Sequence, residues 1–286
     1  MINLVLSILS STSLFVIFKY FDAFKINTLQ AIVVNYFVAS IFGLTHANAF
    51  GKLTTVSSQP WFFGALILGL SFISIFFIMA KTSQENGVSV ASVAGKMSLA
   101  IPVVCGVILY NESLSLLKVL GIILALVAVY LASVKEEKES SIVKGGLLFP
   151  ILLFLGSGII DTFLKYIETN YVKDVPFFSG SIFAFAFLLG SLILLTRVLL
   201  KKEVLEFKNV IAGVIIGIPN YFSIIYFIKS LQINHLDTSV IFTINNVGIV
   251  LACTLVGILL FKEKLSFKNS IGVITAIVGI ILVTIA

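Results

Sequence analysis

Long apolar stretches separated by short polar ones follow one another along nearly the whole chain. Each stretch is about 20 residues long, the length that a helix needs to cross the hydrocarbon core of a bilayer. Helices are predicted because single strands leave backbone groups unpaired in lipid, and the alternation of about ten residues that marks barrel strands is missing. Ten spans are predicted, at 2–19, 29–45, 61–80, 88–110, 115–134, 145–167, 177–196, 209–228, 237–261 and 267–285.

Composition places these helices in a bilayer. Hydrophobic residues make up 59% of the 286 residues and charged residues only 11%, with a mean hydropathy of +1.15. A soluble fold of this length could not bury so much apolar surface. Met1 leads straight into an apolar stretch without the basic segment and cleavage site of a signal peptide, so we expect a retained first span. The sequence therefore predicts an all-α, polytopic membrane protein.

The net charge of +6 is spread over the short polar interruptions. No long basic stripe interleaved with aromatic residues occurs, so nucleic acid is not expected as a partner. Both cysteines, Cys105 and Cys253, lie within apolar stretches, where a free thiol behaves as a small hydrophobic group. The sequence indicates no disulfide, no metal site and no cofactor.

A set of polar and glycine residues occurs twice in the same order. Matched Leu or Ile would mean little in so apolar a chain, whereas matched Lys, Gln, Asn, Glu and Gly rarely arise by chance. At a separation of 148, Lys81, Gln84 and Asn86 recur as Lys229, Gln232 and Asn234. At a separation of 151, Gly106, Glu112, Leu114, Ser115 and Gly121 recur as Gly257, Glu263, Leu265, Ser266 and Gly272. Lys19–Tyr20 has a similar echo in Lys165–Tyr166.

The most polar connection, KEEKESSIVK at 135–144, lies between the fifth and sixth predicted spans. It divides the chain into a first five-helix repeat at 1–134 and a second at 145–286. Because five is odd, the second repeat enters the membrane in the opposite orientation. Two inverted five-helix repeats are typical of transporters, in which similar halves exchange conformations around a site near the bilayer midplane.

The repeated segments also carry a family resemblance. AKTSQENGVSVAS and YNESLS in the first half, with IKSLQINHLDTSV and FKEKLSFKNSIG in the second, resemble the EamA-like branch of the drug/metabolite transporter superfamily. The resemblance covers essentially the whole chain. It implies ten spans in two halves and a carrier of small metabolites in the cytoplasmic (inner) membrane, often an exporter.

Orientation is predicted in two ways that disagree. Most Lys and Arg residues outside the spans follow odd-numbered spans, so the positive-inside rule places both termini outside. The family resemblance implies both termini inside. Ten spans put the two termini on the same side in either case.

Lys96 is the first candidate for the substrate site, because it lies about eight residues into the fourth span. An ionised side chain at such depth costs about 2.5–3.5 kcal/mol on insertion scales and seldom faces lipid. In one interpretation its ammonium reaches the interface or pairs with a carboxylate. In the interpretation we favour, it faces a substrate cavity and selects a carboxylate or phosphate.

Asp161 and Lys165 are four residues apart in the sixth span and therefore share one face of a helix. We favour a self-neutralising pair. The alternative is that Asp161 binds and releases a coupling proton, because burial raises the pKa of a carboxyl group. The small multidrug relatives in the same superfamily carry a membrane-embedded Glu in their first helix, and this chain has none there.

Neutral polar residues complete the candidate site. They either pack helices together by hydrogen bonding or contact substrate. Pro102 and Pro219 are expected to face inward, with Pro219 interrupting the eighth span, because proline frees a backbone carbonyl. The candidate substrate-binding residues are Lys96, Asn35, Asn220, Tyr221, Asn245 and Asn246.

Two further features are interpreted as structural. Glu112 and Glu263 lie at short turns with lysines nearby, and we expect them to hold hairpin geometry. Gly213 and Gly217 form a small-xxx-small pair that allows two helices to approach closely.

Three classes of function are weighed. A secondary transporter for a small metabolite, with an anion or zwitterion and export favoured, agrees with the repeat and the inward polar groups. A multispan channel or scaffold without carrier activity is the alternative, although a channel normally carries a filter or a ring of like charges. An enzyme needs a reactive group of residues. His46 and His235 are the only histidines and lie at span edges without acid–base partners, so no enzyme is expected. A single chain holds both halves of the repeat, so a monomer suffices.

Overall fold

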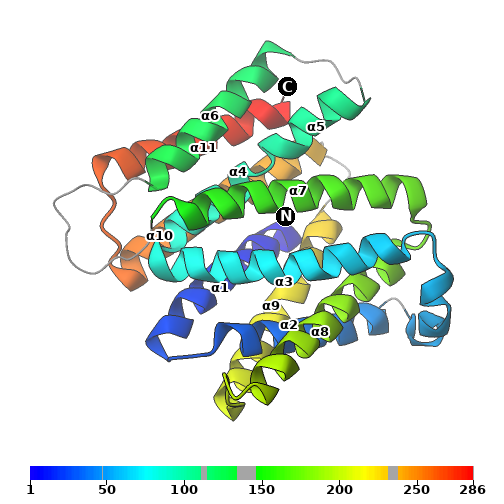
Figure 1. The fold of residues 1–286 in the computed structure, drawn as a ribbon. Helices are drawn as coiled ribbons and strands as arrows, with labels where there is room; N and C mark the ends of the chain where they lie inside the picture. Colours follow the sequence, from blue (N-terminus) through cyan, green and yellow to red (C-terminus); the bar gives the residue numbers. More distant parts are fainter. Residues whose placement is uncertain (47, 111–114, 134–145, 231–237, 286) are drawn as a thin grey trace. The chain divides into compact units, whose positions relative to one another are not determined.

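The computed structural model describes residues 1–46, 48–110, 115–133, 146–230 and 238–285. The predicted connecting loop at 135–144 and Glu112 lie outside these residues. Within them every regular element is a helix, which confirms the all-α prediction (Figure 1). The elements are α1 Ile2–Ala23, α2 Thr28–His46, the 3₁₀ helix η1 Phe50–Ser58, α3 Phe62–Glu85, α4 Val88–Met97, α5 Ala100–Tyr110, α6 Leu116–Ser133, α7 Leu148–Tyr171, α8 Val175–Leu199, α9 Phe207–Ser230, α10 Thr238–Phe261 and α11 Phe267–Ile285.

The helices match the predicted spans closely. Nine segments of the described residues are long and apolar enough to cross a bilayer, and a shorter apolar segment, Val119–Ala132, lies within α6. The fourth predicted span is split between α4 and α5, while each of the others corresponds to a single helix. The protein is therefore a polytopic all-α membrane protein, as predicted.

The helices form two compact units, and each unit takes helices from both halves of the sequence. Unit 1 comprises Met1–Tyr20, Ile78–Asp161 and Phe222–Ala286, and unit 2 comprises Phe21–Phe77 and Thr162–Tyr221. In unit 1, α6 packs along α11 and α4 packs on α10 (Figure 1). In unit 2, α2 packs along α8. Each of these pairs joins the helices that hold the same place in the two halves.

Contacts between α6 and α11 in unit 1 occur in two matching copies. A methyl group added at Gly121 would lie 2.5 Å from the side chain of Val283, and one added at Gly272 would lie 2.5 Å from the backbone nitrogen of Ala132. A separation of 151 relates Gly121 to Gly272 and Ala132 to Val283. The separation of 151 therefore turns each contact into the other, with the two helices exchanged. Because the earlier position of α6 meets the later position of α11, the two helices run antiparallel.

Unit 2 shows the same exchange between α2 and α8. A methyl group at Gly43 would lie 3.2 Å from the Cα atom of Gly180, and one at Gly190 would lie 2.9 Å from Val33. A separation of 147 relates Gly43 to Gly190 and Val33 to Gly180.

A further pair of contacts involves α3 and α9. A methyl group at Gly69 would lie 2.9 Å from the Cβ atom of Phe185, and one at Gly217 would lie 2.8 Å from that of Val38. Gly213, one turn before Gly217, meets α2 just as closely at Val34. The predicted close approach at the Gly213–Gly217 pair is therefore confirmed.

Polar side chains fasten the helix ends of unit 2. Asp174 caps α8 by accepting a hydrogen bond from the backbone N–H of Phe177, and it pairs with Lys52 of η1. The hydrogen bond from Lys52 lowers the pKa of the Asp174 carboxyl. At the start of α9, Asn209 donates to the buried Gln30 side chain at 2.7 Å. These contacts fix α2, α8 and α9 at their ends, outside the apolar packing.

The exchanged glycine contacts predict a destabilising effect for Gly272→Ala. The added methyl group would meet backbone atoms of α6 that cannot rotate away, so overpacking outweighs the small gain in helix propensity. We expect the free energy of unfolding to fall by about 1–3 kcal/mol. The measurement is the melting temperature of the detergent-solubilised protein. Gly51→Ala is the matched control, because nothing lies within 4 Å of the added methyl group there. Equal melting temperatures for the two variants would contradict the packing.

Candidate functional site

The fourth span breaks at Ser98 and Leu99, between α4 and α5. Pro102 lies in the first turn of α5, where it has no N–H to donate and its ring crowds the carbonyl four residues before it, that of Ser98. The Ser98 carbonyl instead accepts a hydrogen bond from the N–H of Ile101 at 2.9 Å. The helix therefore stops just ahead of the proline and restarts.

Gly158 allows α7 to pack directly on this break. A methyl group at Gly158 would lie 2.8 Å from the Ser98 carbonyl oxygen and 2.5 Å from the side chain of Ile101. Asp161 is three residues further along α7 and so lies on the same helix face as Gly158. The packing at Gly158 thereby brings Asp161 toward the end of α4.

Lys96 lies in the last turn of α4 and is half-buried. A cation is favoured there, because the last carbonyl groups of a helix carry partial negative charge. Asp161 is the acidic side chain whose charge acts on the Lys96 ammonium, yet no ion pair within 4.0 Å joins them. The structure thus brings Lys96 and Asp161 together without neutralising the ammonium by direct contact.

The predicted couple of Asp161 and Lys165 is not among the ion pairs of the described residues. Both side chains are exposed on α7. Their pairing stays a prediction, and Lys96 is the cation that acts on Asp161 in this structure.

Small polar groups line the contact between α4 and α10 in unit 1. The buried thiol of Cys253 on α10 lies beside the hydroxyl groups of Ser92 and Thr12 and within electrostatic range of Lys96. Nearer the start of α4, the hydroxyl groups of Ser89 and Thr254 are hydrogen-bonded at 3.1 Å. We call this row of contacts between α4 and α10 the polar seam, formed by Ser89, Ser92, Cys253 and Thr254.

Asn245 and Asn246 lie on α10, in the same unit as Lys96. Asn245 is 6% exposed, and its side-chain oxygen has no hydrogen-bond partner among the residues described. Asn246 is half-buried. A buried carbonyl oxygen without a donor is uncommon and is the kind of group that a ligand can satisfy.

Asn35 and Asn220 meet in unit 2. The Asn220 amide donates to the Asn35 side-chain oxygen at 3.0 Å, and both residues are buried. The Asn35 amide nitrogen has no partner in the part of the chain that the structure describes. Tyr221 stacks on Phe42, with ring centroids 5.3 Å apart. Helix packing therefore uses only part of the hydrogen-bonding capacity of Asn35.

The predicted interruption of the eighth span at Pro219 is wrong. α9 runs as one helix from Phe207 to Ser230 with Pro219 inside it. A proline within a helix removes one backbone hydrogen bond, and here the loss is absorbed without a break. Close packing of Gly213 and Gly217 on α2 holds the preceding turns in place.

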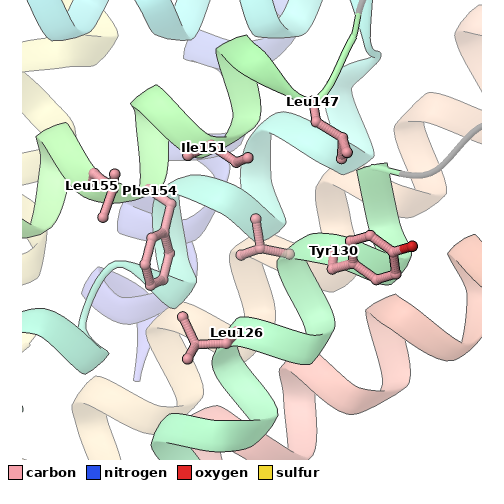
Figure 2. A pocket seen from close by; sticks show the side chains of 7 residues that line it. Leu126, Tyr130, Leu147, Ile151, Phe154 and Leu155 are labelled. Carbon is pink, nitrogen blue, oxygen red and sulfur yellow. The ribbon is translucent and has the colours of Figure 1, made fainter.

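An apolar pocket of about 210 Å³ lies between α6 and α7 in unit 1 (Figure 2). Its lining is Leu126, Val129, Tyr130, Leu147, Ile151, Phe154 and Leu155. None of the candidate site residues lines it. Its walls offer hydrocarbon contact and one phenol, so it has no group that would orient a charged metabolite.

The role of Glu263 was only partly predicted. Its carboxylate accepts hydrogen bonds from the backbone N–H of Val88 at 2.8 Å and of Ser89 at 3.4 Å, at the start of α4. The turn position of Glu263 was visible in the sequence, whereas a partner 175 residues upstream was not. The described residues contain no group of three His, Cys, Asp or Glu side chains that could hold a metal ion.

Comparison with known proteins finds a match to one family model and to two relatives. Residues 1–134 match the EamA-like transporter family, which confirms the resemblance seen in the sequence. An uncharacterized protein of Haemophilus influenzae is 29% identical, with 97% of this chain and 96% of that protein covered. The probable glucose uptake protein GlcU of Priestia megaterium is 29% identical, with 78% of this chain and 79% of that protein covered.

A solved structure supports the fold. One crystal structure matches with a TM-score of 0.59 at 14% identity, covering 98% of this chain and 96% of that chain. At this identity the likeness concerns the fold alone.

The Asn35–Asn220 contact predicts a non-additive pair of substitutions. Asn220→Leu leaves the buried Asn35 oxygen without its donor and should cost about 1–3 kcal/mol of unfolding free energy. The double variant Asn35→Leu with Asn220→Leu removes both polar groups and should recover part of that loss. Melting temperatures in detergent give the comparison, with Asn170→Leu as an exposed control. Additive losses in the double variant would show that the two amides do not depend on each other.

Proposed function

We propose, from the match of residues 1–134 to the EamA-like transporters, that this membrane transporter is an alternating-access carrier that moves a small metabolite. Its substrate is an organic anion or zwitterion, and the direction is export. The cytoplasmic (inner) membrane is its proposed location. One observation carries the proposal: Lys96 lies in the last turn of α4, next to the break in the fourth span.

The broken span supports a substrate site. In transporters, discontinuous helices provide free backbone N–H and carbonyl groups near the bilayer midplane, whereas the backbone groups of intact helices are already paired. α4 ends at Met97, and its last turn holds Lys96, which has no ion pair with a carboxylate among the described residues. A substrate carboxylate or phosphate would complete the coordination of that ammonium. The unpartnered oxygen of Asn245 in the same unit adds an acceptor suited to an amino or hydroxyl group of the substrate.

An inverted repeat supports the carrier mechanism. We infer that residues 1–134 and 145–286 are the two repeats, related by a two-fold axis in the membrane plane. Such an axis exchanges equivalent helices and makes them antiparallel where they pack on each other. The contacts of Gly121 with Val283 and of Gly272 with Ala132 have this property, as do the matching contacts of Gly43 and Gly190. Two similar halves can exchange conformations and so open the site to either side.

Asp161 is the proposed coupling group. Its charge acts on Lys96, and within the part of the chain that the structure describes it forms no direct ion pair that would hold its carboxylate ionised. A proton bound at Asp161 would neutralise the carboxylate that the amino group of a zwitterionic substrate could bind. Proton and substrate would then alternate at the site, so that inward proton movement could drive export. The cycle needs no second subunit, so a monomer suffices.

A neutral, hydroxyl-rich substrate is a second candidate. The unpartnered amide nitrogen of Asn35 is a donor suited to a hydroxyl or ether oxygen. A relative bears the name of a probable glucose uptake protein. A channel remains the alternative mechanism, and saturable exchange separates it from a carrier.

The first prediction from this proposal concerns Lys96. In proteoliposomes loaded with a pool of organic anions, the parent protein should give saturable uptake and counterflow. Lys96→Gln should lower anion counterflow by about tenfold or more, because the loss of one charge-assisted contact is worth at least that factor. Lys96→Arg should retain part of the flux. Lys81→Gln is the matched control, since Lys81 pairs with Glu85 at the end of α3.

Three outcomes would contradict the proposal of an anion carrier. Unchanged anion counterflow in folded Lys96→Gln would remove Lys96 from the site. Saturable glucose counterflow without any anion flux would favour the second candidate. Flux that does not saturate would favour a channel.

The second prediction concerns Asp161. Asp161→Asn cannot exchange a proton, so an imposed pH gradient should no longer drive accumulation of substrate. Counterflow at equal pH on both sides should persist, because that exchange needs no net proton movement. Accumulation driven by the gradient in Asp161→Asn, at the level of the parent, would exclude Asp161 as the coupling group.

A further inference from the structure

Glu263 holds the start of α4 from the turn between α10 and α11. Its two carboxylate oxygens face the N–H groups of Val88 and Ser89, at 2.8 and 3.4 Å. These are among the first N–H groups of α4 and have no partner within the helix. The residue before the helix, Gly87, provides no side-chain cap. The carboxylate therefore does what a capping side chain normally does, and its charge suits the positive end of the helix.

Two glycines make room for this carboxylate. A methyl group at Gly87 would lie 2.7 Å from one carboxylate oxygen of Glu263, and one at Gly257 would lie still closer to the other. Gly87 also has φ of +106°, which side chains rarely adopt. The turn itself is closed by a hydrogen bond from the N–H of Glu263 to the Gly257 carbonyl at 2.9 Å. The socket around the Glu263 carboxylate is thus built from both α4 and α10.

The polar seam continues this contact along α4. It begins at Ser89 and Thr254, next to the socket, and reaches Ser92 and Cys253 one turn further. α4 has ten residues and so rises about 15 Å. Glu263 contacts the start of α4, and Lys96 lies in its last turn at the opposite end.

We infer that Glu263 is a positioning residue for Lys96, and that its carboxylate is a latch that is released during transport. While the latch is closed, α4 lies against α10 and Lys96 has a fixed place. When it opens, α4 can turn about the break at Ser98 and Leu99, which moves Lys96. This inference rests on the proposed role of Lys96 in binding substrate, but the latch itself can be tested without any substrate.

Cys253 is a natural reporter of the latch. Its side chain is fully buried on α10 beside Ser92 of α4. The chain has only one other cysteine, Cys105, so Cys105→Ser leaves a single thiol. Opening of α4 away from α10 would expose that thiol to N-ethylmaleimide, and intact mass measures the labelled fraction. Labelling then tracks the population of the open form.

The test compares Glu263→Ala with Glu85→Ala in the Cys105→Ser background. Loss of hydrogen bonds to a charged group should raise the labelling rate of Cys253 by about tenfold in Glu263→Ala. Glu85→Ala removes the same charge at the end of α3, two residues before Gly87, and should label at the parent rate. Glu263→Gln keeps one acceptor oxygen and should fall between them.

Gly257→Ala gives a second, independent variant. It keeps Glu263 but fills the socket, so the carboxylate must leave, while alanine itself favours a helix. We expect it to label as fast as Glu263→Ala. A melting temperature close to that of the parent establishes for each variant that labelling reflects local opening. Parent-like labelling of folded Gly257→Ala and Glu263→Ala would overturn the latch.

Transport separates the latch from the proposed substrate site. In proteoliposomes, Glu263→Ala should raise the half-saturating anion concentration by about tenfold, because Lys96 is held in place less often. Faster Cys253 labelling with no anion transport in the parent would support the latch and contradict the proposed function. Faster labelling with unchanged half-saturation would show that the latch does not position Lys96 and would overturn that part of the inference.

Discussion

A membrane span that breaks within its length must satisfy its free backbone groups within the protein, and this constraint determines how α4 packs in unit 1. The break before Pro102 leaves α4 as a short helix, Val88–Met97, with free backbone groups at both ends. At one end the Glu263 carboxylate takes up the free N–H groups. At the other end, the last turn holds Lys96, whose charge suits the free carbonyl groups there, and the Ser98 carbonyl accepts a hydrogen bond from the N–H of Ile101. Gly158 then lets α7 cover the break and carries Asp161 toward Lys96. The break at Pro102 thus creates helix ends with charged side chains beside them, and an unbroken helix would have no such ends there.

The two halves of the chain share packing but differ in this central feature. Exchanged glycine contacts recur in both units. α10, which takes the place of α4 and α5 in the second half, is continuous from Thr238 to Phe261 and has Cys253 where the first half has Pro102. On the proposed arrangement, two repeats with matching packing surfaces but one dissimilar span would give a symmetric frame with a charged site in one half.

Much of the fold could be predicted from the sequence, because the length and composition of each apolar stretch determine a spanning helix almost alone. The close approach at Gly213 and Gly217 follows from local spacing in the same way. Contacts between distant segments could not be predicted. Neither the partner of Glu263 nor the approach of Asp161 to Lys96 has any local signal, and both depend on how α4, α7 and α10 pack. At Pro219 a local signal was misleading, because the proline predicted a break in the helix and α9 is continuous there.

The central claim is that Lys96 lies on a pathway that opens to each side of the membrane in turn. It is tested most directly by Lys96→Cys in a chain whose two natural cysteines are replaced by serine. Sealed vesicles of either orientation would be treated with a membrane-impermeant, anionic thiol reagent, and the labelled fraction measured. The account predicts labelling from both sides, reduced by a transported anion. Labelling from one side only, or none in the folded protein, would contradict it.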